Sequence, residues 1–359
     1  MRITSVSWAR QQSRSAALAA RLGASMHFIH RGRGGNPWSA PRRYIAQARE
    51  TWAVWRRERP EVIVVQNPPL PLVLLAYAYC RRHGARYVID SHTGAFLSAP
   101  WRQFTWLHRL LARRALISLV HNWAQGELIG AWTCPAMVLI NSPLMLSAGE
   151  AAALDGAFRV FVVCSYAQDE PIEAIVEAAR ALPEVRFYLS GDSSRMAPHL
   201  RAALPANCRC TGYVPYDEYL SLVRAADVVM ALTTRDGTLL EGAFEAVALR
   251  RPLILSDWPV LRHYFDAGVV HAANTAADLA AAVCRARDEL PSLQRGIEDL
   301  AERLDARWQE QFAVLQDVLA GEAAASTVAA RTRAADTAGS GGDGVRAAHE
   351  SGRSDETAV

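Results

Sequence analysis

The sequence predicts an α/β protein built from two parallel-sheet domains. Short apolar runs of strand length alternate with amphipathic helical stripes in both halves of the 359-residue chain. The runs at 61–65 and 228–232 are apolar almost throughout, which is typical of parallel strands that helices cover on both faces. The alternation breaks near residue 150 and then restarts. A chain of this length has room for two domains of ordinary size.

The first domain is predicted to span residues 1–145, with strands at 3–8, 25–30, 61–65, 86–90, 116–120 and 137–140. Polar residues follow several of these strands. Arg14 lies in the loop after the first, Asn67 follows the third, and His92 and His121 follow the fourth and fifth. Because open α/β sheets bind ligands at the carboxyl ends of their strands, we expect these side chains to lie near a site.

The second domain is predicted to span residues 150–300, after a linker at about 143–157. Its strands are expected at 159–164, 185–189, 210–214, 228–232 and 253–255. A separate helix is expected over 301–320. Residues 321–359 are rich in Ala, Gly, Ser and charge and contain no aromatic residue, so we expect a disordered tail.

The segment 226–265 reads as strand, polar loop, helix and strand. The apolar residues of the helix recur at spacings of three and four: Leu240, Ala243, Phe244, Val247 and Ala248. A helix that begins at the carboxyl end of a parallel strand offers free N–H groups and a positive dipole end to a phosphate. Glu245 lies beside this stripe. It is either a ligand contact or an ordinary surface charge of the helix.

This segment resembles the donor-binding core of the retaining glycosyltransferases of family 4. Glu245 and Ala246, followed by Pro252 and an apolar strand, match the second half of the family pattern, and the turns at 190–192 and 212–215 are similar to two other parts of the core. The resemblance covers about 1–315 and is specific over 185–270. It implies the GT-B fold, with two Rossmann-like domains facing across a cleft, acceptor side first and donor side second. In that fold the last helix often crosses back to the first domain.

The resemblance also implies roles for single residues. Glu245 would hold the ribose of the donor. His92 would lie beside the sugar, with a capping or structural histidine as the alternative. The first Glu of the family pattern falls on Gly237, so the neighbouring Asp236 is the second catalytic candidate. The implied donor-binding set is Glu245, Gly237, Thr238, Leu239, Gly191, Asp192, Val214, Arg14 and Arg235, and the implied acceptor side is Asn67, Thr93 and His121.

One departure from the family concerns the donor diphosphate. Family members hold it with an Arg and a Lys from the loop that corresponds to 165–171, whereas this loop carries Asp169 and Glu170. All 39 basic residues of the chain are Arg. Either other arginines replace the pair or turnover has been lost; the candidates for replacement are Arg10, Arg14, Arg235 and Arg262.

Charge is distributed unevenly along the chain. Residues 1–145 carry 19 Arg and 5 acidic residues, a net charge of +14, whereas residues 146–320 carry 16 Arg and 25 acidic residues, a net charge of −9. A basic half indicates an anionic ligand or surface, and no nucleic-acid motif accompanies it. A helix predicted over 100–115 would place Arg102, Trp106 and Arg109 on one arc. This arc is either a membrane-surface face or a solvated one.

The sequence shows no transmembrane run and no signal peptide. We therefore expect a cytoplasmic protein, peripheral on the inner face of the cell membrane if the basic half binds lipid. The six Cys are spread out, and a lone C-x-C at 208–210 is a weak metal signal. We expect no metal and no cofactor beyond the nucleotide sugar as co-substrate.

The function that these features favour is a retaining glycosyltransferase. It would move a sugar from a nucleotide diphosphate sugar to a polysaccharide, glycolipid or lipid-linked acceptor. Gly237 and the missing Arg–Lys pair keep open a non-catalytic nucleotide-sugar-binding protein of the same fold. A nucleotide-sugar epimerase is the other alternative, but it needs acidic groups in the cleft, and the first half has only 5.

Overall fold

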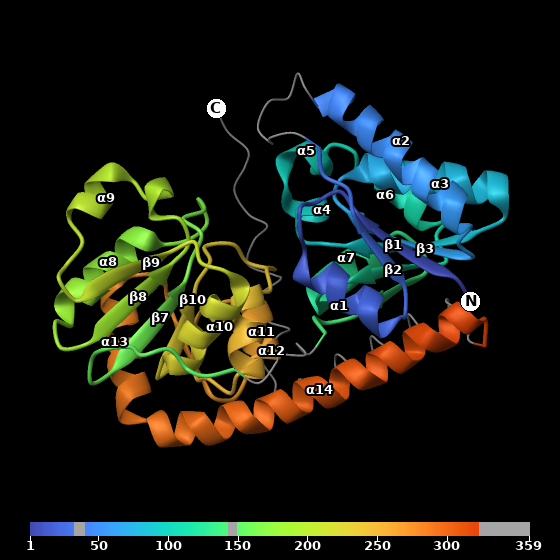
Figure 1. Cartoon of the computed structure of the whole chain (residues 1–359). Helices are drawn as coiled ribbons and strands as arrows, with labels where there is room; N and C mark the ends of the chain where they lie inside the picture. The colour runs from blue at the N-terminus through green and yellow to red at the C-terminus, as the bar shows by residue number, and fades with distance from the viewer. Residues whose placement is uncertain (32–39, 143–148, 323–359) are drawn as a thin grey trace, which may run out of the picture.

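The computed structural model describes residues 1–31, 40–142 and 149–322. Within them the chain forms two six-stranded sheets, each covered by helices, which lie side by side in Figure 1. Every pairing between neighbouring strands is parallel. The predicted α/β architecture of two parallel-sheet domains is confirmed. The centre of the predicted linker and the tail beyond residue 322 lie outside the described residues.

The first sheet has the strand order β2-β1-β3-β4-β5-β6. Its strands are β1 (Ile3–Ser7), β2 (Ser25–Phe28), β3 (Val62–Asn67), β4 (Arg86–Ser91), β5 (Ile117–Val120) and β6 (Ala136–Val138). The helices of this half are α1 (Ser13–Arg21), α2 (Ala40–Glu58), α3 (Leu70–His83), α4 (Gly94–Leu97), α5 (Ala99–Arg102), α6 (Thr105–Ala112) and α7 (Trp123–Gly130). The central strand β3 is buried at nearly every position, as its apolar run predicts.

The second sheet has the order β12-β11-β10-β7-β8-β9. Its strands are β7 (Arg159–Val163), β8 (Arg186–Ser190), β9 (Cys208–Gly212), β10 (Val228–Ala231), β11 (Leu253–Ser256) and β12 (Val269–Ala272). The helices are α8 (Ile172–Ala181), α9 (Pro198–Ala202), α10 (Tyr216–Ala225), α11 (Glu241–Ala248), α12 (Pro259–Tyr264) and α13 (Ala276–Asp288), with a short 3₁₀ helix, η2 (Ser193–Arg195).

The strand orders fix where a ligand would bind. In each sheet, successive strands are added first toward one edge and then toward the other. This reversal of the strand order falls between β1 and β3 in the first sheet and between β7 and β10 in the second. At such switch points the loops after the two strands diverge to opposite faces and leave a crevice at the carboxyl edge. The loop after β1 and the loop after β7 therefore lie at the two positions where a site between the domains is expected.

The last helix, α14 (Leu290–Ala320), runs beneath both domains (Figure 1). It is 31 residues long and begins before the predicted 301. Its start packs against α11, α13 and β12. Further along, Gln311 accepts a hydrogen bond from the Ile140 backbone at 3.0 Å, and Arg21 lies over the buried Trp308 ring. The helix therefore contacts elements of both halves.

The helix predicted over 100–115 is wrong in its extent. The structure has two short helices there, α5 and α6, and the chain leaves helical geometry between them at Phe104. The Thr105 hydroxyl donates to the Arg102 carbonyl at 2.7 Å, a local bond that competes with helix continuation. The chain turns at this point, which places the Phe104 and Trp106 side chains on the surface.

Candidate functional site

A cavity of about 710 Å³ lies between the domains at the switch point of the second sheet. Its base is formed by residues 163–165 and 231–232, at the carboxyl ends of β7 and β10. Residues 11–13, after β1, close it from the first domain. The remaining walls come from 190–195, from 212–219 and from the start of α11. A volume of this size suits a small-molecule ligand.

Glu245 supplies a buried carboxylate to this cavity; the residue is 6% exposed. Tyr219 donates its hydroxyl to one carboxylate oxygen at 2.6 Å, and Tyr216 donates to the other at 3.0 Å. Burial raises the pKa of the Glu245 carboxyl, against these two hydrogen bonds, which lower it. A carboxylate has about four acceptor positions, so Glu245 retains capacity for two ligand hydroxyl groups.

Two glycines let the backbone approach closely around the cavity. A Cβ on Gly191, whose φ is +80°, would lie 2.4 Å from the Cys164 carbonyl oxygen. A Cβ on Gly242 would lie 2.6 Å from Val163 Cγ1. Gly242 thereby brings the first turn of α11 against the end of β7. The free N–H groups and the positive dipole end of α11 are thus directed at the cavity.

The carboxyl edge of the first sheet is filled by a buried ion pair. Arg14 donates to Asp90 at 3.2 Å, to Asn141 at 2.9 Å and to the Leu139 carbonyl at 2.8 Å. Arg14 is 3% exposed and Asp90 is 1% exposed. Burial would raise the pKa of Asp90, but Arg14 first, and then His92 and His121, outweigh it and hold this pKa well below its usual range.

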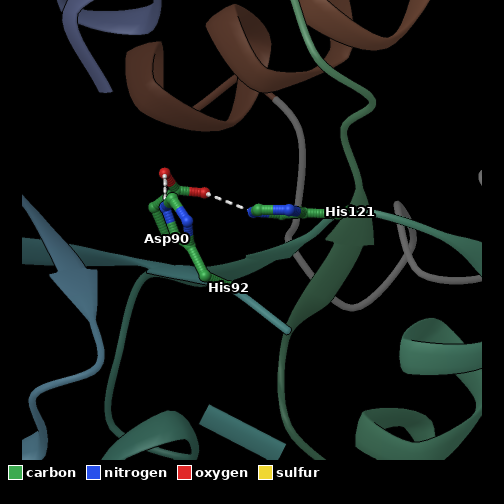
Figure 2. A group of neighbouring side chains, drawn as sticks. All are labelled: Asp90, His92 and His121. Atoms are coloured by element: carbon green, nitrogen blue, oxygen red, sulfur yellow. Dashed lines mark hydrogen bonds and ion pairs between the residues drawn. The ribbon is translucent and has the colours of Figure 1, made fainter. Parts of the chain in front are cut away.

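Two histidines contact the same carboxylate (Figure 2). His92 Nε2 lies 3.1 Å from Asp90 Oδ2, and His92 Nδ1 lies 3.4 Å from the Gln12 amide nitrogen. Because a carboxylate only accepts, His92 Nε2 is the donor toward Asp90, and Nδ1 faces the Gln12 amide. His92 is absent from the cavity lining, whereas Gln12 lines the cavity. His92 therefore lies one contact behind the cavity wall.

His121 is the more deeply buried of the two histidines. Its Nε2 points toward Asp90 Oδ1 at 3.7 Å (Figure 2) and has no hydrogen-bond partner among the described residues. Burial, followed by the charges of Arg14 and His92, lowers the pKa of His121 to about 3. His121 is therefore neutral at physiological pH.

Asp90, His92 and His121 offer three ligand atoms within 4.8 Å of one another, a spacing that could hold a metal ion. Arg14 already provides the counter-charge of Asp90 from 3.2 Å, and it would repel a divalent cation in this low-dielectric place. The donor set alone suits zinc, but the adjacent guanidinium does not. The expectation that no metal is required stays a prediction.

Hydrogen bonds join the two domains beside the cavity. Glu241, in the first turn of α11, accepts from the Ser13 hydroxyl at 2.7 Å and from the Asn141 amide at 2.8 Å. Asn122 donates to the Gly237 carbonyl at 3.0 Å. Because Asn141 also accepts from Arg14, the buried network of the first domain is linked to the helix that carries Glu245.

Four of the predicted donor-binding residues line the cavity: Glu245, Gly191, Asp192 and Val214. The other five lie outside its lining: Gly237, Thr238, Leu239, Arg14 and Arg235. The predicted role of Arg14 on the diphosphate is revised, because its guanidinium is buried and engaged by Asp90, Asn141 and Leu139. Arg235 lies 3.7 Å from Asp169 and is half exposed.

The acceptor-side residues are largely packed. Asn67 is 1% exposed and its amide contacts His108 Nε2 at 3.0 Å, so its predicted contact with an acceptor is revised to a structural role. Thr93 accepts from Gln125 at 2.9 Å. Asp236, the second catalytic candidate, is exposed and accepts from the Gly237 backbone at 2.6 Å, outside the cavity lining.

Sequence reasoning missed Asp90, Gln12, Tyr216, Tyr219 and Arg195. Asp90 had a usable signal, since a carboxylate at the end of an apolar strand and two residues before His92 is unusual in a core. The two tyrosines lie three residues apart, one turn of α10, which places them on one face. Arg195 ends η2 and lines the cavity. Nothing in the sequence distinguishes it from the other arginines.

Residues 158–289 match the family model described as glycosyl transferases group 1. No curated protein matches the sequence. Among solved structures, sucrose-phosphate synthase from Thermosynechococcus elongatus is similar with a TM-score of 0.70 at 11% identity, over 89% of this chain and 100% of that one.

HepE from Anabaena in complex with UDP is similar with a TM-score of 0.63 at 12% identity, over 88% and 100% of the two chains. A putative UDP-N-acetylglucosamine 2-epimerase from Listeria monocytogenes has a TM-score of 0.63 at 12% identity, over 90% and 98%. At these identities the structures establish a shared two-domain fold.

Proposed function

We propose that this chain, whose residues 158–289 match the glycosyl transferases group 1 family model, is a GT-B glycosyltransferase that transfers a sugar from a nucleotide diphosphate sugar with retention of configuration. The acceptor would be a polysaccharide, a glycolipid or a lipid-linked sugar. The observation that carries the proposal is the interdomain cavity. The cavity is lined by the buried Glu245 carboxylate, by backbone that Gly191 and Gly242 allow to approach closely, and by the N-terminus of α11.

The nucleoside would occupy the side of the cavity formed by the second domain. The ribose hydroxyl groups would donate to Glu245, which already accepts from two tyrosines. The base would lie against Tyr213 and Val214, which line the cavity; Tyr213 is 89% exposed and free to cover a ring. HepE, a structural relative, was solved with UDP-glucose, which supports a donor of this class.

The diphosphate would lie at the N-terminus of α11, where the helix dipole favours negative charge. Arg195 lines the same cavity and would supply the positive charge that the acidic loop at 165–171 lacks. Glu241 belongs to this turn as well, but its carboxylate is held toward the first domain by Ser13 and Asn141. That contact reduces its repulsion of an incoming phosphate.

In the reaction, the bond between the anomeric carbon and the diphosphate oxygen would break while the acceptor oxygen bonds to the same face of the sugar. The acceptor proton would pass to the departing phosphate, so no side chain need act as general base. The chain's residues would orient the reactants and stabilise charge on the leaving group. Asp90 would fix the ring of His92 and thereby the position of Gln12 at the cavity wall.

The test is to follow the transfer product by proton NMR, with donors chosen by base. A product that keeps the donor's anomeric configuration supports the proposal, and an inverted product contradicts retention. The epimerase alternative has a structural relative. It is tested in the same tube without acceptor, since an epimerase would interconvert the free nucleotide sugar. Nucleotide binding with neither reaction would favour the non-catalytic alternative.

A membrane-bound acceptor is favoured by one surface of the first domain. On α4–α6 and the adjoining turn, four large apolar side chains are between 42% and 65% exposed: Leu97, Phe104, Trp106 and Leu110. Arg102 and Arg109 lie on the same helices. No helix in the described ranges has the length and apolarity to cross a bilayer. We propose that this surface rests on an anionic membrane.

Flotation with anionic vesicles tests this surface. Binding should be strongest at low salt, because salt screens the arginine contribution. Trp106→Ser should weaken it, whereas Leu128→Ser, a substitution of an apolar residue on α7 that is also exposed, should not. An absence of binding at low salt would show that the surface is merely solvated.

A further inference from the structure

A second cavity, of about 640 Å³, lies at the opposite edge of the first sheet. It forms where the chain enters β1, β3 and β4, at the amino ends of these strands, whereas the site described above lies at their carboxyl ends. Its arginines are Arg2, Arg56, Arg59 and Arg86, and its other lining residues include Glu61, Tyr79 and His83. Four arginines and one glutamate therefore line one concave space. The Arg86 guanidinium donates to the Leu319 carbonyl at 3.0 Å and Arg2 Nε to the Arg59 carbonyl at 2.9 Å, so Arg56 and Arg59 are the two whose guanidinium groups remain for a ligand.

The single carboxylate offsets only part of the arginine charge. Glu61 accepts from the Arg2 backbone at 2.6 Å and lies 4.0 Å from the terminal amine. The guanidinium groups of Arg56 and Arg59 make no hydrogen bond or ion pair within the ranges that the structure describes. The carboxyl ends of α2 and α3 lie nearby, and their dipoles favour positive charge. This effect explains basic residues at the helix ends, but it does not require them to converge on a cavity.

The cavity is held in shape without a ligand. Arg59 has a φ of +50° in the left-handed region. Its N–H donates to Trp55 at 2.8 Å, and its carbonyl accepts from Arg2 Nε at 2.9 Å. Tyr79 donates to the Trp55 carbonyl at 2.9 Å and stacks on His83 with ring centroids 4.3 Å apart. The backbone of Arg59 and the ring floor are thus fixed, and the ordering that a ligand would impose falls on the Arg56 and Arg59 side chains.

We propose that this cavity binds a phosphate-bearing anion, as a site separate from the donor cavity. Guanidinium groups bind phosphate oxygens with paired, charge-assisted hydrogen bonds, and the cavity has room for a phosphomonoester or a diphosphate. The phosphate could belong to a dissolved compound or to a lipid headgroup. This site does not depend on the proposed glycosyl transfer.

The first experiment titrates the full chain with pyrophosphate by calorimetry and locates binding by hydrogen exchange of peptides covering 56–61 and 79–86. The Arg56→Gln/Arg59→Gln variant should bind at least about tenfold more weakly at this site. Both residues are exposed, so the fold should be retained. Arg201→Gln, at an exposed position on α9, is the matched control. Arg195→Gln removes the arginine of the donor cavity and should leave protection of 56–61 and 79–86 unchanged.

The second arm uses phosphatidylcholine vesicles with and without phosphatidic acid. Binding that requires phosphatidic acid and is lost in the double variant, without pyrophosphate binding, would assign the site to a lipid headgroup. Pyrophosphate binding lost in the double variant would assign it to a dissolved phosphate compound. The proposal is overturned if the double variant matches the wild type in both arms. Vesicle binding that only Trp106→Ser reduces belongs to the α4–α6 surface, and the pyrophosphate arm alone then decides.

Discussion

The carboxyl edges of the two sheets differ in what occupies them. The edge of the first sheet is filled by its own side chains, with Asp90 enclosed by Arg14 and two histidines. The edge of the second sheet is open, and Glu245 faces a cavity of about 710 Å³. Both edges contain a buried carboxylate, but only Glu245 lines a cavity that a ligand could enter.

The environments move the two carboxyl pKa values in opposite directions. Arg14 and the histidines outweigh burial and hold the pKa of Asp90 well below its usual range, whereas burial raises the pKa of Glu245. The charge of Asp90 is paired with Arg14 and stabilises the fold of the first domain. The partners of Glu245 are neutral hydroxyl groups, so its carboxylate can accept further hydrogen bonds from a ligand. We infer that Asp90, at the edge of the first sheet, positions neighbouring side chains, and that Glu245, at the edge of the second sheet, binds the ligand.

We expect the largest effect from disrupting the buried ion pair between Arg14 and Asp90 at the carboxyl edge of the first sheet. Arg14→Met leaves the Asp90 charge buried without its partner, which should lower the free energy of unfolding by about 3–5 kcal/mol. Urea denaturation measures this change. Arg235→Gln, which removes a half-exposed partner of Asp169, should cost less than about 1 kcal/mol. Equal costs for the two variants would show that the buried pair has no special weight.

A substitution of Glu245 at the carboxyl edge of the second sheet should weaken nucleotide binding and leave the fold intact. Glu245→Ala should weaken nucleotide binding by about 10- to 100-fold, the value of hydrogen bonds to a charged group. Isothermal titration calorimetry measures it, and circular dichroism checks the fold. Glu218→Gln, at an exposed position on α10, is the control. An unchanged affinity in Glu245→Ala would remove Glu245 from the ribose site.

Acid should weaken the first domain through its buried histidines. Burial lowers the pKa of His121 to about 3 and that of His108 to about 4, whereas in the unfolded chain both titrate near 6.5. Between these values the unfolded state binds more protons, so stability should fall by about 1.4 kcal/mol per pH unit for each histidine as the pH drops.

The contribution of Asp90 behaves differently, because its lowered pKa keeps it ionised in the folded state. That contribution should persist above its unfolded pKa of about 3.9 and be lost only at lower pH. Urea midpoints at several pH values test the account: His121→Gln should show a shallower loss than the wild type between about pH 6 and pH 4. Parallel curves would contradict the buried, neutral His121.

The smallest effect should come from His92, which lies behind the cavity wall. His92→Ala should reduce turnover by about tenfold, less than the roughly 10²–10⁴-fold of a group that itself transfers a proton, with little change in nucleotide affinity. Steady-state rates and calorimetry on the same preparation separate the two quantities. Unchanged turnover would assign His92 to packing alone.

The sequence was sufficient for features that depend on local periodicity. The apolar stripe from Leu240 to Ala248 predicts α11, and the uniform apolar run before Asn67 predicts a buried parallel strand; both are present. The helix predicted over 100–115 was wrong in its extent, since the backbone leaves helical geometry at Phe104, where the Thr105 hydroxyl bonds to the Arg102 carbonyl. Helical periodicity does not register such a bond.

The candidate site was less predictable because it depends on distant pairs. Arg14 and Asp90 are 76 positions apart, and Ser13 and Glu241 are 228 apart. No local pattern shows that Arg14 is buried against Asp90 or that Arg195 reaches the cavity. Glu245 could be found because its whole strand-loop-helix unit is contiguous in the chain.

The proposed function requires the second domain to bind a nucleotide through Glu245. The most direct measurement is the melting temperature of the wild type and of Glu245→Ala with UDP, GDP, ADP and TDP and their sugars. We predict that nucleotides of one base raise the melting temperature of the wild type, as mass action requires for a ligand well above its dissociation constant, and that Glu245→Ala loses most of this shift. No shift with any nucleotide, or an equal shift in the variant, would contradict the claim.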